Sequence, residues 1–198
     1  PRVWFLLTGN SDAVKDSQTI LRRGSMKREF RKLFVYAAVV IGLTFFVITF
    51  VAQRTQVNGE SMYPALHDKD NLIVDKFSYH FCDPKRYDIV VFPYHYKDRT
   101  YYIKRVIGLP GETVQIKDGC VYIDGQRLDE HFSEEKIQNA ALASEPIVLG
   151  KDEYFVLGDN RNASEDSRFP DVGKVKRKEI IGRAWIRIWP LNGRNFKI

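Results

Sequence analysis

A long uncharged stretch dominates the hydropathy pattern of this chain: Leu33–Ala52 holds 20 residues without one charged side chain. As a helix the run would measure about 30 Å, the thickness of a bilayer's hydrocarbon core. A buried core helix and the apolar part of a cleaved signal peptide are the alternatives. A chain of 198 residues has little protein to surround such a helix, and no small-x-small cleavage site follows it. The run therefore predicts an attached transmembrane anchor.

Basic residues flank this anchor unequally. Four Lys and Arg side chains lie in residues 26–32, before it, whereas Arg54 alone lies just after it. Positive charge favours the cytoplasmic side of a membrane span. We therefore expect a cytoplasmic basic segment over residues 26–32, a single-pass anchor in the plasma membrane over residues 33–52, and an extracytoplasmic domain over residues 53–198.

Residues 1–25 match neither the anchor nor the domain after it. We hypothesise that Met26 is the biological initiator and that residues 1–25 are an upstream or non-native extension without stable structure. Native protein whose N-terminal sequence starts before Met26 would refute this hypothesis.

After the anchor the pattern changes to short runs rich in Val, Ile, Tyr and Phe, which are typical of strands. The predicted strands are Asn71–Phe77, Asp88–Tyr94, Tyr101–Leu109, Thr113–Ile116, Cys120–Ile123, Glu153–Leu157 and Ile180–Trp189. Asp118-Gly119 and Asp124-Gly125 are signals of hairpin turns. Residues 129–147 are charged and small, with some helical character, and predict a surface insertion or lid. The fold class predicted is mostly β.

Composition narrows the possible functions. The formal charge is +6, but the basic residues are dispersed or lie beside the anchor, so nucleic acid is not an expected partner. Cys82 and Cys120 lack metal-ligand spacing and are too few for a disulfide framework, so we expect no metal. Whether these two cysteines pair stays open.

Three stretches after the anchor carry candidate chemistry. In the first, Ser61 lies two residues after Gly59 and three before Pro64, a context that can present a hydroxyl on a stiff backbone. A simple turn serine is the alternative.

In the second stretch, Lys104 shares one face of a predicted strand with Tyr102, so burial would lower its pKa and make it a general base. An exposed solubilising lysine is the alternative.

The third stretch, residues 158–168, follows a strand and is dense in polar and ionic groups. A calcium-binding loop is one interpretation, but Arg161 and Arg168 would compete with a cation for the carboxylates. An ion pair between Asp166 and Arg168 that fixes the loop explains the pattern more economically.

Together and in order, the anchor, Ser61-Met62-Tyr63-Pro64, the stretch YYIKRVIGLPGE around Lys104 and the stretch GDNRNASEDSR resemble bacterial type I signal peptidases. These are membrane-anchored serine proteases with a β-rich body. The resemblance implies that Ser61 is the nucleophile and Lys104 its general base. It also implies that Ser164 forms a hydrogen bond to the lysine and orients it, and that Asp159, Asp166 and Arg168 hold the scaffold of the site.

The resemblance has further implications. Gram-negative members carry a serine where this chain has Gly59, so the chain is similar to the Gram-positive type, in which backbone amides such as that of Ser61 supply more of the oxyanion hole. No cofactor is needed, a monomer is expected, and the partners are membrane lipid and the signal peptides of preproteins. The expected substrate-binding residues are Met62, Tyr63, Pro64, Tyr102 and Ile103.

Other classes remain open at this point. Self-cleaving repressors of the SOS type use the same dyad, but they are soluble and lack an anchor. A membrane-tethered β domain that acts in binding or assembly, without catalysis, is the second alternative. A Ser-His-Asp triad is disfavoured because none of the four histidines lies in a matching motif.

Overall fold

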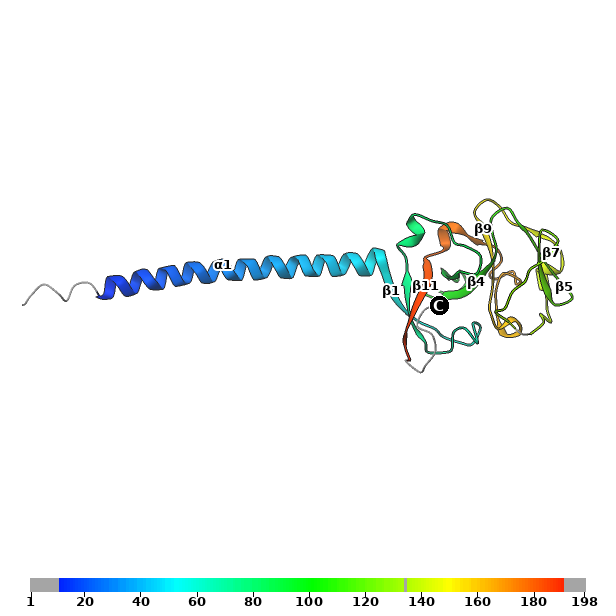
Figure 1. Ribbon diagram of the computed structural model, residues 1–198, viewed down its shortest axis with the longest axis horizontal. Coiled ribbons are helices and arrows are strands. Elements are labelled where there is room, and N and C mark those ends of the chain that lie inside the picture. The colour runs from blue at the N-terminus through cyan, green and yellow to red at the C-terminus, as the bar shows by residue number, and fades with distance from the viewer. Residues whose placement is uncertain (1–10, 134, 191–198) are drawn as a thin grey trace, which may run out of the picture. The chain divides into compact units, whose positions relative to one another are not determined.

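The computed structural model describes residues 11–133 and 135–190, and the chain divides into two compact units, residues 1–47 and 48–198 (Figure 1). The first unit consists of helix α1 (Ser11–Phe46), in which the apolar side chains from Phe30 onward are exposed. Residues 11–25 are therefore helical, which differs from the expected lack of structure. The part of that expectation that concerns residues 1–10 lies outside the described residues.

The predicted anchor is not one continuous helix. Helix α1 ends at Phe46, a π-helical turn η1 covers Val47–Val51, and strand β1 begins at Ala52. From Ala52 onward the chain is extended, because Ala52 already pairs with Asp75 in the first antiparallel ladder of the sheet. Within the described part of the chain, we find no helix that is both long and apolar enough to cross a membrane.

The second unit is built on an antiparallel sheet of seven strands in the order β1-β2-β11-β3-β4-β9-β10. Their bounds are Ala52–Gln56 (β1), Asn71–Asp75 (β2), Gly182–Trp189 (β11), Ile89–Pro93 (β3), Tyr101–Gly108 (β4), Glu153–Leu157 (β9) and Val175–Lys176 (β10). A smaller sheet has the order β7-β6-β5-β8, with bounds Gln126–Arg127, Cys120–Ile123, Thr113–Lys117 and Ile147–Val148. Single turns of 3-10 helix lie at Ser78–His80 (η2), Ala141–Ser144 (η3), Arg161–Ala163 (η4) and Arg177–Glu179 (η5).

The mostly β prediction is confirmed, and each of the predicted strands overlaps an observed one. The strands that the pattern did not reveal, β1, β7, β8 and β10, are polar or only two residues long. At the two predicted hairpin turns, the aspartate and the glycine both have positive φ, as a tight hairpin requires. Among the described residues of 129–147 the expected helical character is limited to η3, and backbone groups of Lys136, Gln138 and Asn139 bond instead to Asn162 and Arg168.

A buried apolar cluster between the start of the domain and the large sheet positions the segment after β1. Val57, Met62 and Leu66 pack there against Leu72 and Ile89, and Met62 and Leu66 have no exposed surface. Burial of two large side chains on either side of the Tyr63-Pro64 dipeptide fixes the turn that carries Ser61. The turn is therefore held by the core of the domain and does not hang as a free loop.

Candidate active site

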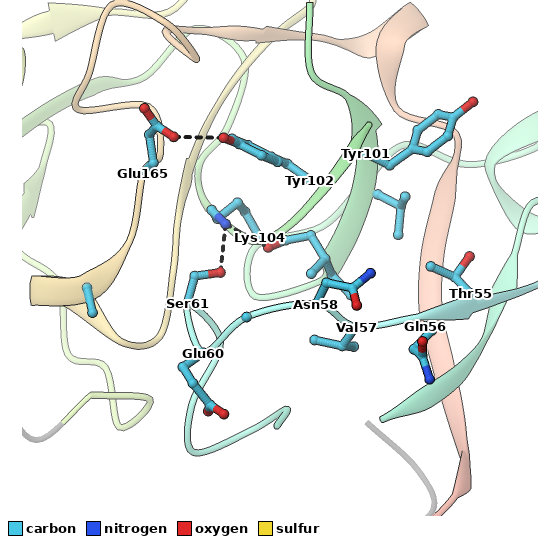
Figure 2. A pocket seen from close by; sticks show the side chains of 14 residues that line it. Thr55, Gln56, Val57, Asn58, Glu60, Ser61, Tyr101, Tyr102, Lys104 and Glu165 are labelled. Atoms are coloured by element: carbon cyan, nitrogen blue, oxygen red, sulfur yellow. Dashed lines mark hydrogen bonds between the residues drawn. The ribbon is translucent and has the colours of Figure 1, made fainter. Parts of the chain in front are cut away.

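The side chains of Ser61 and Lys104 meet at the surface of the large sheet. Lys104 lies on β4 opposite Val90 of β3, and its Nζ donates a hydrogen bond of 2.8 Å to Ser61 Oγ (Figure 2). A second bond of 3.2 Å runs from Nζ to the Ile103 carbonyl. A hydroxyl and an amine separated in sequence are thus in direct contact, at the distance that proton transfer requires.

Lys104 is buried without a counter-ion. The residue is 4% exposed, and no described carboxylate forms an ion pair with it. Burial lowers the pKa of Lys104 from 10.5 to about 8, a shift that the more distant charges of Asp166, Glu165 and Asp159 partly oppose. The amine is therefore tuned toward the neutral form near physiological pH.

The neighbouring Arg105 points to the other face of β4, as the alternation predicted. It forms a bidentate pair with Asp159, with distances of 2.7 and 2.6 Å, and its guanidinium lies 3.7 Å from the ring centre of Phe132. Burial raises the pKa of Asp159 and the bond to Arg105 opposes that rise. Because Arg105 is neutralised in this way, the depressed pKa of Lys104 comes from burial, not from repulsion by Arg105.

The loop after β9 packs against the serine turn. The expected pair between Asp166 and Arg168 is present and bidentate, at 2.8 and 2.9 Å, and Asp166 also accepts from the Gly158 N–H. The Asn160 N–H donates to the Ser61 carbonyl at 3.1 Å. The fully buried carboxylate of Asp166 therefore ties the two ends of the loop together, and the loop in turn fixes the backbone of Ser61.

Ser164 packs closely against Gly158 in this loop. A Cβ on Gly158 would clash with Ser164 Oγ and would lie 2.5 Å from the Ser61 carbonyl oxygen, so only glycine fits. Ser164 Oγ is buried and has no hydrogen-bond partner among the described residues; the bond to Lys104 that the resemblance implied is not formed in this structure. We did not predict a role for Gly158, although a glycine directly after a buried strand is a signal of close backbone approach.

The backbone N–H groups of Gly59 and Ser61 differ in whether they are available to donate a hydrogen bond to an oxyanion. The Gly59 N–H donates to Asp68 Oδ1 at 2.8 Å, and this bond is the main reason that the pKa of Asp68 is lowered. Among the described groups, none accepts a hydrogen bond from the Ser61 N–H. Gly59 has a φ of 96°, a conformation that strains other residues, so its contribution is to shape the turn while the Ser61 amide stays available for an oxyanion.

A pocket of about 290 Å³ opens beside the pair. Of the five expected substrate-binding residues, Tyr102 and Ile103 line it, whereas Met62 is buried in the core and Tyr63 and Pro64 lie outside the lining. Met62 thus supports the turn from beneath. The remaining lining residues come from β1, the serine turn, β3, β4 and the loop after β9: Thr55, Gln56, Val57, Asn58, Gly59, Glu60, Ser61, Val91, Tyr101, Lys104, Ala163 and Glu165.

Neither a disulfide nor a metal centre adds to this site. Cys82 and Cys120 are both free thiols. Within residues 11–133 and 135–190, no group of three or more His, Cys, Asp and Glu side chains is arranged to hold a metal ion.

Comparison with known proteins identifies the family. Residues 28–189 match the family model described as signal peptidase, peptidase S26. Signal peptidase I of Leptolyngbya laminosa is 47% identical over 73% of this chain and 72% of its own length. The probable signal peptidase I-2 of Synechocystis is 36% identical over 88% and 83%. A crystal structure of a signal peptidase I from Enterococcus faecalis is 33% identical and covers 52% of this chain and 97% of its own, with a TM-score of 0.44. The chain belongs to the type I signal peptidases of family S26, which are hydrolases that cleave signal peptides.

Proposed function

We propose that this chain cleaves signal peptides with a serine-lysine dyad formed by Ser61 and Lys104. The observation that supports it is the 2.8 Å contact between the hydroxyl and a buried amine that pairs with none of the carboxylates in the described residues. When the amine is neutral, the Ser61 O–H donates to Nζ, and Lys104 can accept the proton as the oxygen attacks.

In the reaction, Ser61 Oγ attacks the scissile carbonyl while its proton moves to Nζ of Lys104. The N–H of Ser61 stabilises the negative oxygen that forms. The lysinium then protonates the leaving amine, the peptide bond breaks, and an acyl-enzyme ester remains. Water gives a proton to Lys104 as it attacks this ester. Lys104 then returns the proton to Ser61 Oγ as the ester bond breaks, which releases the signal peptide as a carboxylic acid and restores the free serine.

The position of the lysine makes this chemistry feasible at ordinary pH. With a pKa of about 8, about one Lys104 side chain in ten is neutral at pH 7, against about one in three thousand at the ordinary value of 10.5. The gain in the population of the reactive form is therefore about 300-fold.

An open strand edge suggests how the peptide binds. Residues 101–104 of β4 pair with β3 on one side, whereas β9 pairs with β4 only from Arg105 onward. The other edge of residues 101–104 therefore lacks a neighbouring strand within the described sheet, next to the pocket and to Ser61. An extended signal peptide of a preprotein can add there by backbone hydrogen bonds, with small side chains in the pocket.

Lipid is the second partner in this proposal. Apolar side chains of α1 such as Phe34, Ile41 and Phe45 are between 68% and 76% exposed, which is costly in water and favourable in a bilayer. We place the apolar segment in the plasma membrane as a single pass, with the basic residues before it in the cytoplasm and residues 53–198 outside. Protease added to intact spheroplasts should then digest the β domain; protection of that domain would contradict this orientation.

The dyad is tested with single substitutions in the full chain in detergent. Ser61→Ala and Lys104→Ala should each abolish cleavage of a preprotein, because each removes one partner of the proton transfer. Lys117→Ala, which changes an exposed lysine on β5, is the matched control and should leave the rate unchanged. Cleavage that persists in either dyad variant would refute the mechanism, and a binding module would be indifferent to both.

A further inference from the structure

A hydrogen bond that the mechanism above does not use joins two walls of the pocket. The Tyr102 hydroxyl, on β4, donates to Glu165 Oε2, in the loop after η4, at 2.7 Å (Figure 2). Both residues line the pocket that contains Ser61 and Lys104. The bond therefore links the strand that carries the lysine with the loop that holds the serine backbone.

The Tyr102 end of this bond is held firmly. The Tyr102 ring stacks on Tyr94 at 4.4 Å with planes 10° apart, and Phe92 meets it edge-on. Burial and then the bond to Glu165 raise the pKa of Tyr102, so the phenol keeps its proton and stays a donor.

The Glu165 end is also held, although its side chain is exposed. The next residue, Asp166, is fully buried and pinned by Arg168 and by the Gly158 N–H. The hydrogen bond thus joins two supported groups, and forming it costs little conformational entropy.

The ring held in this way lies beside the reacting amine. Lys104 Nζ is 4.9 Å from the centre of the Tyr102 ring. A side chain next to the bond that Ser61 attacks has to enter the space bounded by these groups. If the phenol swung away, the pocket would be wider at this end and water could reach the amine.

We propose that Glu165 is a positioning and specificity-determining residue: through the Tyr102 hydroxyl it fixes the phenol as a wall of the pocket, and this wall limits the size of the side chain accepted next to the cleaved bond. The inference rests on the proposed function, since it needs the pocket beside Ser61 to receive the substrate. In this proposal Glu165 acts as a hydrogen-bond acceptor for the Tyr102 hydroxyl, and its negative charge is not what limits the size of the accepted side chain.

Three substitutions separate the bond from the charge. Tyr102→Phe deletes the donor and keeps the ring, and Glu165→Ala deletes the acceptor. Glu165→Gln keeps an oxygen acceptor for the phenol but removes the charge. Glu145→Gln is the matched control, because Glu145 is an exposed carboxylate that does not line the pocket.

The assay compares kcat/KM for peptides that differ only in having Ala, Val or Leu before the cleaved bond, with the full chain in detergent. Tyr102→Phe and Glu165→Ala should each raise the Leu-to-Ala ratio by about tenfold, the scale of steric discrimination in an apolar pocket. The double variant should match the single ones, because both remove the same bond. Glu165→Gln and Glu145→Gln should keep the wild-type ratio.

An unchanged Leu-to-Ala ratio in Tyr102→Phe and Glu165→Ala would overturn the proposal. A ratio in Glu165→Gln equal to that in Glu165→Ala would also overturn it, because the effect would then come from the charge and not from the hydrogen bond. An equal loss of rate for all three peptides, without a change of ratio, would reduce the bond to a structural role and also overturn it. Failure of the proposed function itself is distinct, since it would appear as cleavage by Ser61→Ala.

Discussion

Replacing the buried amine by an apolar side chain should destroy activity and at the same time stabilise the protein. Lys104→Met keeps an unbranched chain of similar length on β4 and removes the charge that burial disfavours. The space around this residue, which is 4% exposed, is already shaped for such a chain. Hydrolysis should be lost because no base remains, and folding should become more favourable at pH 7.

The magnitude follows from the pKa of Lys104. The folded value is about 8 and the unfolded value is 10.5, so a proton on the amine costs the folded state about 3 kcal/mol at pH 7. The bond to Ser61 that the variant loses offsets about 1 kcal/mol of this. A net gain of about 2 kcal/mol remains, which corresponds to a rise of about 4 to 8 °C in melting temperature for a domain of this size.

The sign of the pH dependence is the sharper test. Between pH 8 and 10.5 the unfolded chain keeps the Lys104 proton and the folded chain has released it, so wild-type stability rises with pH in that window. The advantage of Lys104→Met should therefore be complete below pH 8, vanish near pH 10 and reverse above it, where only the lost bond to Ser61 remains. The measurement is thermal unfolding of the full chain in detergent at several pH values, for the wild type and Lys104→Met. Lys117→Met, at an exposed site, is the control. The reasoning would be refuted if the difference in stability between Lys104→Met and the wild type stayed constant with pH. It would also be refuted if the wild type were the more stable protein at pH 7.

Three further outcomes are expected. Because the neutral form of Lys104 is the base, kcat should rise with pH through a transition near pH 8, and a peptide assay that gives a flat profile would contradict a lysine base. Gly158→Ala places a methyl group 2.5 Å from the Ser61 carbonyl oxygen, so kcat should fall by about 100-fold or more in a folded enzyme, as measured by single-turnover cleavage. Arg105→Met leaves Asp159 buried and unpaired, which should destabilise the domain by about 3 to 5 kcal/mol in thermal unfolding, whereas an unchanged melting temperature would show that the pair is not needed.

Sequence periodicity was sufficient to predict the environment of a residue where that environment depends only on the strand that carries it. The alternation along residues 101–109 placed Lys104 with Tyr102 on one face and Arg105 on the other, and the structure has this arrangement. The strands rich in β-branched and aromatic residues were found for the same reason, since their side chains record which face is buried.

Features that depend on contacts between segments far apart in the sequence could not be predicted from the pattern of polar and apolar residues. Met62 lies beside the nucleophile in sequence, but the core under the turn takes its side chain, so it cannot line the pocket. The last residue of the apolar run, Ala52, is extended because it pairs with β2, which no property of the run itself reveals. Ser61 and Lys104 are 43 residues apart, and their contact depends on how the turn and β4 are packed.

The ion pairs around the site explain why Lys104 is buried without a carboxylate partner among the described residues. Each buried arginine in the described residues has a carboxylate partner: Arg105 with Asp159, Arg161 with Glu130, Arg168 with Asp166 and Arg187 with Asp70. Arginine holds a carboxylate through two parallel bonds, which a lysine cannot form, so the nearby acids are bound before they can turn toward the amine. Lys104 is left buried against a hydroxyl, a backbone carbonyl and an aromatic ring. An acidic loop close to the lysine therefore does not neutralise it, because its buried carboxylates are already committed to arginines.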